Sequence, residues 1–144
     1  MGLLSKLFGG NLISAAKKGH IGKVQEFLNN GSDPNELEYG FSALMFACEA
    51  GHEEVVKVLL EGGADAKVAE PSQSLTPLMA ACSGAGFANM NSKEERALVI
   101  AKLLVEHGAD VNSVGKSGQT ASNFASEAGH QKVVQFLNEK GAKA

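Results

Sequence analysis

The sequence predicts an all-α solenoid of four helix-turn-helix units, joined by extended, hairpin-like fingers. Similar segments recur along the chain, and each of them ends at or near a glycine. They read FLNNGSD, LLEGGAD, LVEHGAD and FLNEKGA, and their shared glycines are Gly31, Gly63, Gly108 and Gly141. Those glycines lie 32, 45 and 33 residues apart. A repeat of about 33 residues is typical of stacked supersecondary units.

The second helix of each unit is predicted from apolar residues at helical spacing. In each unit an apolar position is followed three to four residues later by another, which makes the stripe of an amphipathic helix. The stripes are Val24 with Phe27-Leu28, Val55-Val56 with Leu59-Leu60, Ile100-Ala101 with Leu104-Val105, and Val133-Val134 with Leu137. Each stripe then meets one of the four glycines, which favour the left-handed conformation that ends a helix.

The first helices are predicted from two columns of small side chains. The columns are Ala15, Ala47, Ala81 and Ala125, and beside them Ala16, Cys48, Cys82 and Ser126. Small side chains allow neighbouring helices to approach closely. Polar residues in the first and last units predict that both ends are caps of a complete array. The fingers are expected at 33–40, 65–74 and 110–118, where turn residues are dense.

The third unit carries an insertion between its two helices. Leu44 and Leu59 are 15 residues apart, whereas the matching Leu78 and Leu104 are 26 apart. Ser92 with Glu95 three residues later predicts a capping box and a helix over 93–106. The loop at 84–91 carries Phe87 and Met90.

These features resemble the ankyrin repeat family. Thr76-Pro77-Leu78-Met79-Ala80-Ala81 stands where the family has T-P-L-H-x-A. The resemblance covers residues 11–144, with repeats at about 11–36, 37–70, 71–114 and 115–144, and residues 1–10 as an N-terminal extension or cap. It implies a non-catalytic protein–protein interaction module, a small adaptor or inhibitor.

Composition limits the class of partner and compartment. The chain is 44% hydrophobic and 20% charged, with a net charge of −3, so no general attraction to nucleic acid is expected. No apolar run approaches the roughly 18 residues of a membrane span. Two cysteines fit a reducing compartment. We therefore expect a cytoplasmic monomer whose partner is another protein, with no nucleic acid and no membrane.

The histidines, aspartates and cysteines, which could be catalytic or metal-binding residues, are better explained by structural roles. His20, His52 and His130 follow the repeat glycine, where each ring is expected to bridge the turn and the finger backbone. Equivalent positions of stacked repeats lie about 10 Å apart, so these rings do not converge on one metal ion. The aspartates of the chain share one repeat position and leave none to orient a catalytic histidine. No catalytic residue, metal site or cofactor is predicted, and Cys48 and Cys82 are expected to be buried thiols.

The resemblance also implies where a partner binds, namely a concave groove of finger tips and first helices. The family's contact positions fall on Glu36, Glu38, Tyr39, Phe41, Glu49, Gln73, Leu75, Ser83, Lys116, Ser117, Gln119 and Glu127. Tyr39 and Phe41 are the aromatic candidates for energetic hot spots. The alternative for Phe41, held equally, is that its ring packs under the finger and has a structural role only. The glutamates indicate a basic partner or a solvated acidic face.

Two further segments leave alternatives open. Phe87 in the insertion is a candidate contact residue, or else it folds back on the neighbouring repeat. Leu3, Leu4, Leu7 and Phe8 form a short apolar stripe before Gly9-Gly10. We expect this stripe to cap the first repeat. The alternative function is a peripheral membrane-associated scaffold that uses this N-terminal stripe.

Overall fold

The predicted units are present as helix pairs. The computed structural model describes residues 10–84 and 92–142 of the 144-residue chain, and four helix pairs lie within them. The first helices are α2 (Leu12–Lys18), α4 (Ala43–Ala50), α6 (Pro77–Ser83) and α8 (Ala121–Glu127). The second helices are α3 (Ile21–Asn29), α5 (Glu53–Glu61), α7 (Lys93–Glu106) and α9 (Gln131–Glu139). The all-α solenoid is confirmed.

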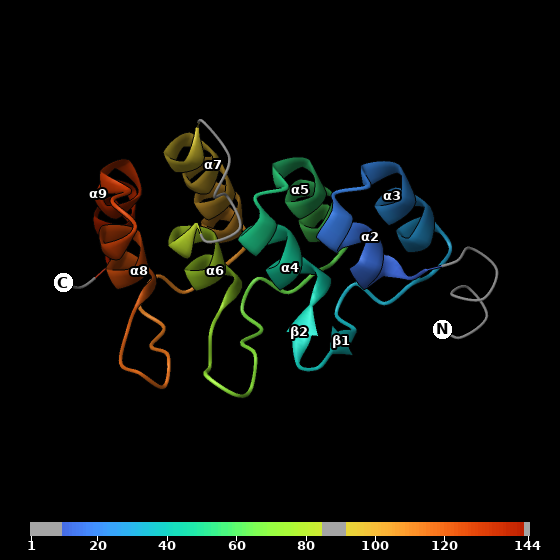
Figure 1. The fold of residues 1–144 in the computed structure, drawn as a ribbon, viewed down its shortest axis with the longest axis horizontal. Coiled ribbons are helices and arrows are strands. Elements are labelled where there is room, and N and C mark those ends of the chain that lie inside the picture. Colours follow the sequence, from blue (N-terminus) through green and yellow to red (C-terminus); the bar gives the residue numbers. More distant parts are fainter. Residues whose placement is uncertain (1–9, 85–91, 143–144) are drawn as a thin grey trace.

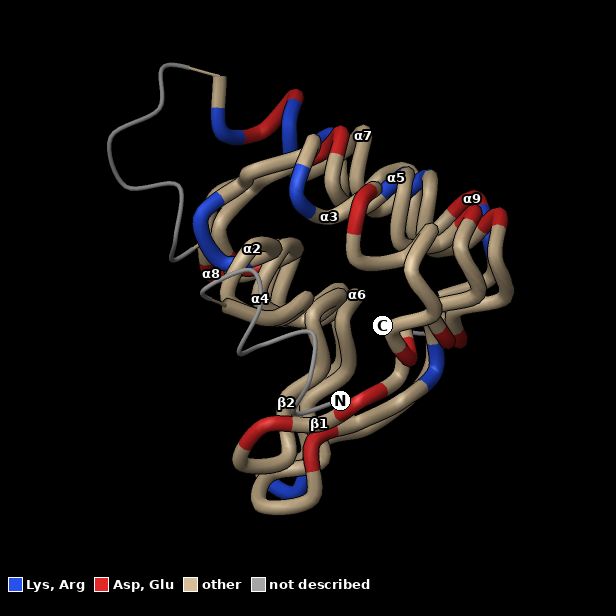
Figure 2. Tube along the Cα trace, turned by 90° about the vertical axis from the view of Figure 1, so that its right-hand side faces the viewer, with Lys and Arg blue, Asp and Glu red and all other residues tan. Residues whose placement is uncertain are grey.

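The helix pairs stack in chain order (Figure 1). First helices form one layer, second helices form another, and the fingers extend away from the helices on the side of the first helices (Figure 2). Within the first layer α2 packs on α4, α4 on α6 and α6 on α8, and the second helices follow the same order. Each unit buries its apolar surface against its sequence neighbours. We call the side formed by the fingers and the outer surfaces of the first helices the finger face.

Polar side chains begin the first helices, and glycines follow the second helices. Each polar side chain accepts a hydrogen bond from the backbone amide three residues later, which satisfies a donor that the helix leaves free. These capping residues are Asn11, Ser42, Thr76 and Thr120. The four shared glycines after the second helices have φ between 91° and 101°. The predicted left-handed helix ends are therefore confirmed.

Helix α7 has the bounds that the sequence predicts, but it lacks the predicted cap at its start. The expected capping box is wrong, because the Ser92 side chain caps no backbone amide. Ser92 has φ −124° and ψ 48°, outside the extended conformation of the residues that cap the first helices. The Glu95 carboxylate instead lies 3.2 Å from the Lys132 ammonium on α9. Phe87, Met90 and residues 1–9, for which the sequence also gave expectations, lie outside the described residues.

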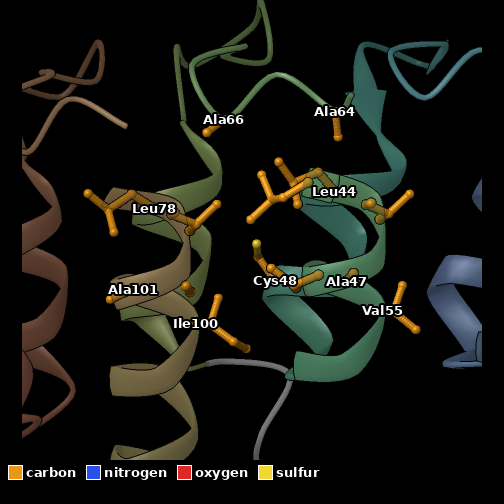
Figure 3. Close-up of a cluster of buried hydrophobic side chains, with 14 of the residues drawn as sticks. Leu44, Ala47, Cys48, Val55, Ala64, Ala66, Leu78, Ile100 and Ala101 are labelled. Carbon is orange, nitrogen blue, oxygen red and sulfur yellow. The ribbon is translucent and has the colours of Figure 1, made fainter. Parts of the chain in front are cut away.

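The core runs along the array between the two helix layers. Figure 3 shows the part where Leu44 of α4 meets Leu78 of α6, with Ile100 of α7 beside them. Ala64 and Ala66, at the start of the second finger, close this cluster on the finger side.

Both columns of small residues lie in this core, as predicted, except at the last unit. The alanine column is buried throughout. In the second column Ser126 of α8 is exposed, whereas Cys48 and Cys82 are fully buried. Both thiols are free. Burial raises the pKa of Cys82 to about 12 and that of Cys48 further still, because the thiolate loses its hydration.

Enlarging the alanine column should force neighbouring repeats apart. We expect Ala47→Leu to lower the free energy of unfolding by about 1 to 3 kcal/mol, since the residue is fully buried. Ala128→Leu, the same change at an exposed position after α8, should stay within about 0.5 kcal/mol of the parent. Urea unfolding followed by circular dichroism measures both values, and equal losses would contradict the packing role of Ala47.

Candidate functional site

Histidine side chains connect neighbouring units at the turn between the two helices. The His52 ring lies over Gly19, where a Cβ atom would stand 2.8 Å from the ring. His52 Nε2 lies 3.1 Å from the carbonyl oxygen of Lys17 in the preceding unit. The expected bridge between turn and finger is therefore wrong, because the space at Gly19 places the ring against the neighbouring helix end. His130 approaches Gly84 through one ring atom, since a Cβ atom on Gly84 would stand 2.8 Å from His130 Nε2.

An arginine makes the corresponding contact in the third unit. The insertion leaves this unit without a Gly-His pair, and Arg96 of α7 reaches back to the second unit. Its Nη1 donates a hydrogen bond to the carbonyl oxygen of Gly51 at 3.4 Å. The same nitrogen lies 3.9 Å from the Glu53 carboxylate. The lengthened unit thus remains attached to its neighbour.

Each finger begins with the same side-chain turn. Asp33, Asp65 and Asp110 each accept a hydrogen bond from the backbone amide two residues later, at 2.8 to 2.9 Å. Asn35 then joins two units. Its Nδ2 donates to the carbonyl oxygen of Gly63 at 3.1 Å, and its Oδ1 accepts from the amide of Asp65 at 2.8 Å. These bonds fix the direction in which a finger leaves the second helix.

The first finger is a tight β-hairpin. Strand β1 (Leu37–Glu38) pairs antiparallel with β2 (Phe41–Ser42). The loop residues Tyr39 and Gly40 have φ of 53° and 86°, as a type I′ turn requires, and such turns favour asparagine and glycine. Tyr39 is 95% exposed. The protein therefore carries backbone strain of about 1 to 3 kcal/mol at an aromatic residue that adds nothing to the core.

The second finger is organised around a buried glutamate. Glu70 is 2% exposed, and its carboxylate accepts hydrogen bonds from the amides of Ser72, Gln73 and Leu75 and from the Ser72 hydroxyl. Burial by itself would raise the pKa of Glu70, but these hydrogen bonds favour the charged form and hold the pKa below its ordinary value. They also support Ser74, which has a positive φ of 58°.

The fingers contact one another. The amide of Lys116 on the third finger donates to the carbonyl oxygen of Gln73 at 2.9 Å, and Lys116 Nζ donates to the carbonyl oxygen of Pro71 at 3.0 Å. The first finger approaches Pro71 closely, since a Cβ atom on Gly40 would lie 2.8 Å from Pro71 Cδ. The three fingers therefore form one connected surface.

An apolar hollow of about 160 Å³ lies on the finger face. It is lined by Phe41, Met45, Glu49, Leu75, Met79, Ala80, Ser83 and Phe124. Positions 45 and 49 of α4, and 79 and 83 of α6, are four residues apart, so each pair shares one side of its helix. Elements from the second, third and fourth units thus meet at one site, which we call the central hollow.

A second hollow of about 290 Å³ adjoins it toward α2. It is lined by Lys17, Phe46, Glu49 and Ala50, so Glu49 belongs to both hollows. The Lys17 ammonium lies 4.2 Å from the centre of the Phe46 ring and 3.4 Å from the Glu38 carboxylate. Both contacts occupy this cation.

The described residues offer neither a metal site nor a membrane-spanning helix. Across residues 10–84 and 92–142, no group of three or more histidine, cysteine, aspartate or glutamate side chains could hold a metal ion. None of the helices described in these ranges is long and apolar enough to cross a bilayer.

Comparison with known families decides what kind of array this is. The model of ankyrin repeats in three copies matches residues 12–92 and again residues 73–144. The chain belongs to the ankyrin repeat family.

The curated relatives of this ankyrin array are larger proteins. It is similar to "Ankyrin repeat, SAM and basic leucine zipper domain-containing protein 1" of Dasypus novemcinctus, with 35% identity over 130 residues, 90% of this chain and 26% of that protein. The Homo sapiens protein of that name is 35% identical over 117 residues, 81% of this chain and 23% of that protein. The chain spans about a quarter of the length of the curated relatives it matches.

The structure separates the predicted contact residues of the ankyrin array into groups. Phe41, Glu49, Leu75 and Ser83 line the central hollow. The group at the other end comprises Lys116, Ser117, Gln119 and Glu127, on the third finger and α8. Within it the Gln119 side-chain amide donates to the Glu127 carboxylate at 2.7 Å, and the Ser117 hydroxyl donates to the Gln119 side-chain oxygen at 3.3 Å.

The remaining predicted residues have different surroundings. Tyr39 projects from the hairpin tip, and Glu38 beside it pairs with Lys17. Gln73 accepts the main-chain bond from the third finger. Glu36 is half-buried at the finger base, and Phe87 lies outside the described residues.

Sequence reasoning missed several residues of the site. Met45 and Met79 lie four residues before Glu49 and Ser83 on the same helices, a spacing that signals a shared side, whereas no such spacing points to Phe124. Glu70 was also missed. An isolated glutamate in a finger gives no sign that it folds inward to accept hydrogen bonds.

The buried carboxylate of Glu70 should make stability depend on pH. We expect Glu70→Gln to lower the free energy of unfolding by about 1 to 3 kcal/mol at neutral pH, because an amide cannot accept all of these hydrogen bonds. The folded-state pKa lies below the ordinary value of 4.5. The carboxylate therefore stabilises the fold above that value, and the effect is lost as pH falls through the folded-state pKa. Urea unfolding across this range measures it; a pH-independent difference would contradict the assignment.

The strain at Tyr39 should be released by a residue suited to the turn. We expect Tyr39→Asn to maintain or raise the free energy of unfolding, and Tyr39→Val to lower it by about 1 kcal/mol, because a β-branched residue tolerates positive φ poorly. Thermal and urea unfolding measure both changes. A clear loss of stability in Tyr39→Asn would show that the ring supports the fold after all.

Proposed function

We propose that this ankyrin repeat array is a non-catalytic module, an adaptor or inhibitor, that binds another protein through its finger face. Ankyrin repeats generally mediate protein–protein interactions. The observation that carries the proposal is the central hollow, where apolar side chains of three units converge on an accessible surface. Apolar concavities with a few polar groups at their edges are the usual form of a binding site.

The first finger supports this proposal independently. Tyr39 combines near-complete exposure with a strained backbone, and strain of this kind is kept mainly where function requires it. Tyrosine is among the residues that contribute most to protein interfaces. It stands on the same hairpin as Phe41, which lines the central hollow. A partner seated in the hollow would therefore also meet this hairpin.

The connections between fingers favour binding without rearrangement. The bonds of Asn35, Glu70 and Lys116 hold the fingers in place before any partner arrives. A preformed surface avoids part of the ordering cost that reduces the affinity of flexible loops. The proposal therefore includes a rigid mode of recognition, with the fold little changed on association.

Capture from the source lysate tests the proposal with variants on two sides of the molecule. Ser83→Arg places a large charged side chain at the central hollow, and Tyr39→Asn removes the aromatic ring. Gln135→Arg is the matched control, at an exposed position on α9. We expect the parent and Gln135→Arg to retain the same partner, while Ser83→Arg and Tyr39→Asn lose at least about 1 kcal/mol of binding free energy.

Quantitative mass spectrometry of the captured proteins gives the comparison, after circular dichroism has shown that every variant is folded. Equal capture by all four proteins would move the binding site away from the finger face.

A further inference from the structure

We propose that the partner of the finger face is a peptide segment that pairs one apolar side chain with a neighbouring lysine or arginine. The apolar side chain enters the central hollow, and the cation binds the Glu49 carboxylate at its edge. This inference rests on the proposed function and specifies the chemistry of the partner.

The size of the central hollow limits what enters it. Its volume of about 160 Å³ is below the roughly 300 to 1,000 Å³ of pockets that hold small organic ligands. It suits one side chain of a protein rather than a cofactor or metabolite. Met45 and Met79 form part of the lining, and methionine side chains adapt to the shape of what they contact.

The polar lining of the hollow is mostly engaged. The Ser83 hydroxyl donates to the carbonyl oxygen of Ala80, in its own helix. The remaining lining residues other than Glu49 are apolar. Specificity for a polar partner group therefore falls on Glu49.

Glu49 differs from the other acidic groups around it. Glu38 pairs with Lys17, and Glu127 accepts from Gln119. Glu70 is enclosed by its own finger. Glu49 is exposed, and within the described residues no hydrogen bond or ion pair engages its carboxylate.

The position of Glu49 on its helix also favours a cation. Glu49 stands in the last turn of α4 (Ala43–Ala50), where the carbonyl end of the helix carries partial negative charge. Lys17, the cation that lines the second hollow with Glu49, already contacts Glu38 and the Phe46 ring. A lysine or arginine of the partner would offset both the carboxylate and the helix end, and the second hollow leaves room for its chain.

Selection of displayed random peptides on the full chain tests this chemistry. The bait proteins are the parent, Glu49→Gln, Glu49→Lys and the control Glu54→Lys, which changes an exposed glutamate of α5. We expect the parent and Glu54→Lys to select peptides with lysine or arginine beside an apolar residue. Glu49→Lys should select aspartate or glutamate at that position instead.

The peptide most enriched by the parent then serves as a labelled probe in fluorescence anisotropy. We expect its affinity to fall about tenfold in Glu49→Gln, to fall with rising salt for the parent, and to be unchanged in Glu54→Lys. Suppose that the selected peptides bind the parent and not Ser83→Arg. If they then lack a preference for lysine or arginine, or bind Glu49→Gln as tightly as the parent, this inference is overturned and the proposed function stands. Absence of any peptide that distinguishes the parent from Ser83→Arg would overturn both.

Discussion

Close packing between neighbouring first helices is the constraint on which the rest of this array depends. Small side chains such as Ala47, Ala81 and Cys82 recur at matching positions of these helices, and all three are fully buried. Each finger leaves one unit and enters the first helix of the next, so the separation of the helices also sets the separation of the fingers. The main-chain bond from Lys116 to Gln73 requires that spacing. The central hollow requires it too, because α4 and α6 supply most of its wall.

The third unit shows how this packing survives a change in sequence. Additional residues lie between its helices, and α7 is the longest helix described. Contacts to both sides nevertheless persist. Arg96 reaches the second unit at Gly51, and Glu95 reaches Lys132 in the fourth. The exposed ion pair at Glu95 contributes little by itself. It is the burial of Ile100 and Leu104 that keeps α7 in register with its neighbours.

The sequence was sufficient for those parts of the fold that arise from repetition. Helix α7 has its predicted bounds, and the shared glycines have the predicted conformation, because periodicity and backbone preference are local properties. Contacts between units were harder to predict from the sequence. The His52 bond to Lys17 and the Arg96 bond to Gly51 join residues 35 and 45 positions apart. The Ser92 cap is absent because the backbone there has a geometry that no motif encodes. In the candidate site, Phe41 and Leu75 were predicted as contact residues from their position in the repeat. The inward turn of Glu70 could not be predicted in this way, because it depends on four simultaneous hydrogen bonds.

The reactivity of the two buried thiols depends on how often the array opens. Cys48 and Cys82 stand at the same position of adjacent first helices, fully enclosed and protonated at neutral pH. A thiol reagent meets them only when neighbouring units separate or unfold, since the folded stack admits no solvent to either sulfur. The rate of alkylation at each cysteine therefore reports how often the middle of the solenoid opens, and no added label alters the packing. In a nearest-neighbour array such openings divide the molecule into halves, and the two rates would tell on which side of α6 the division occurs.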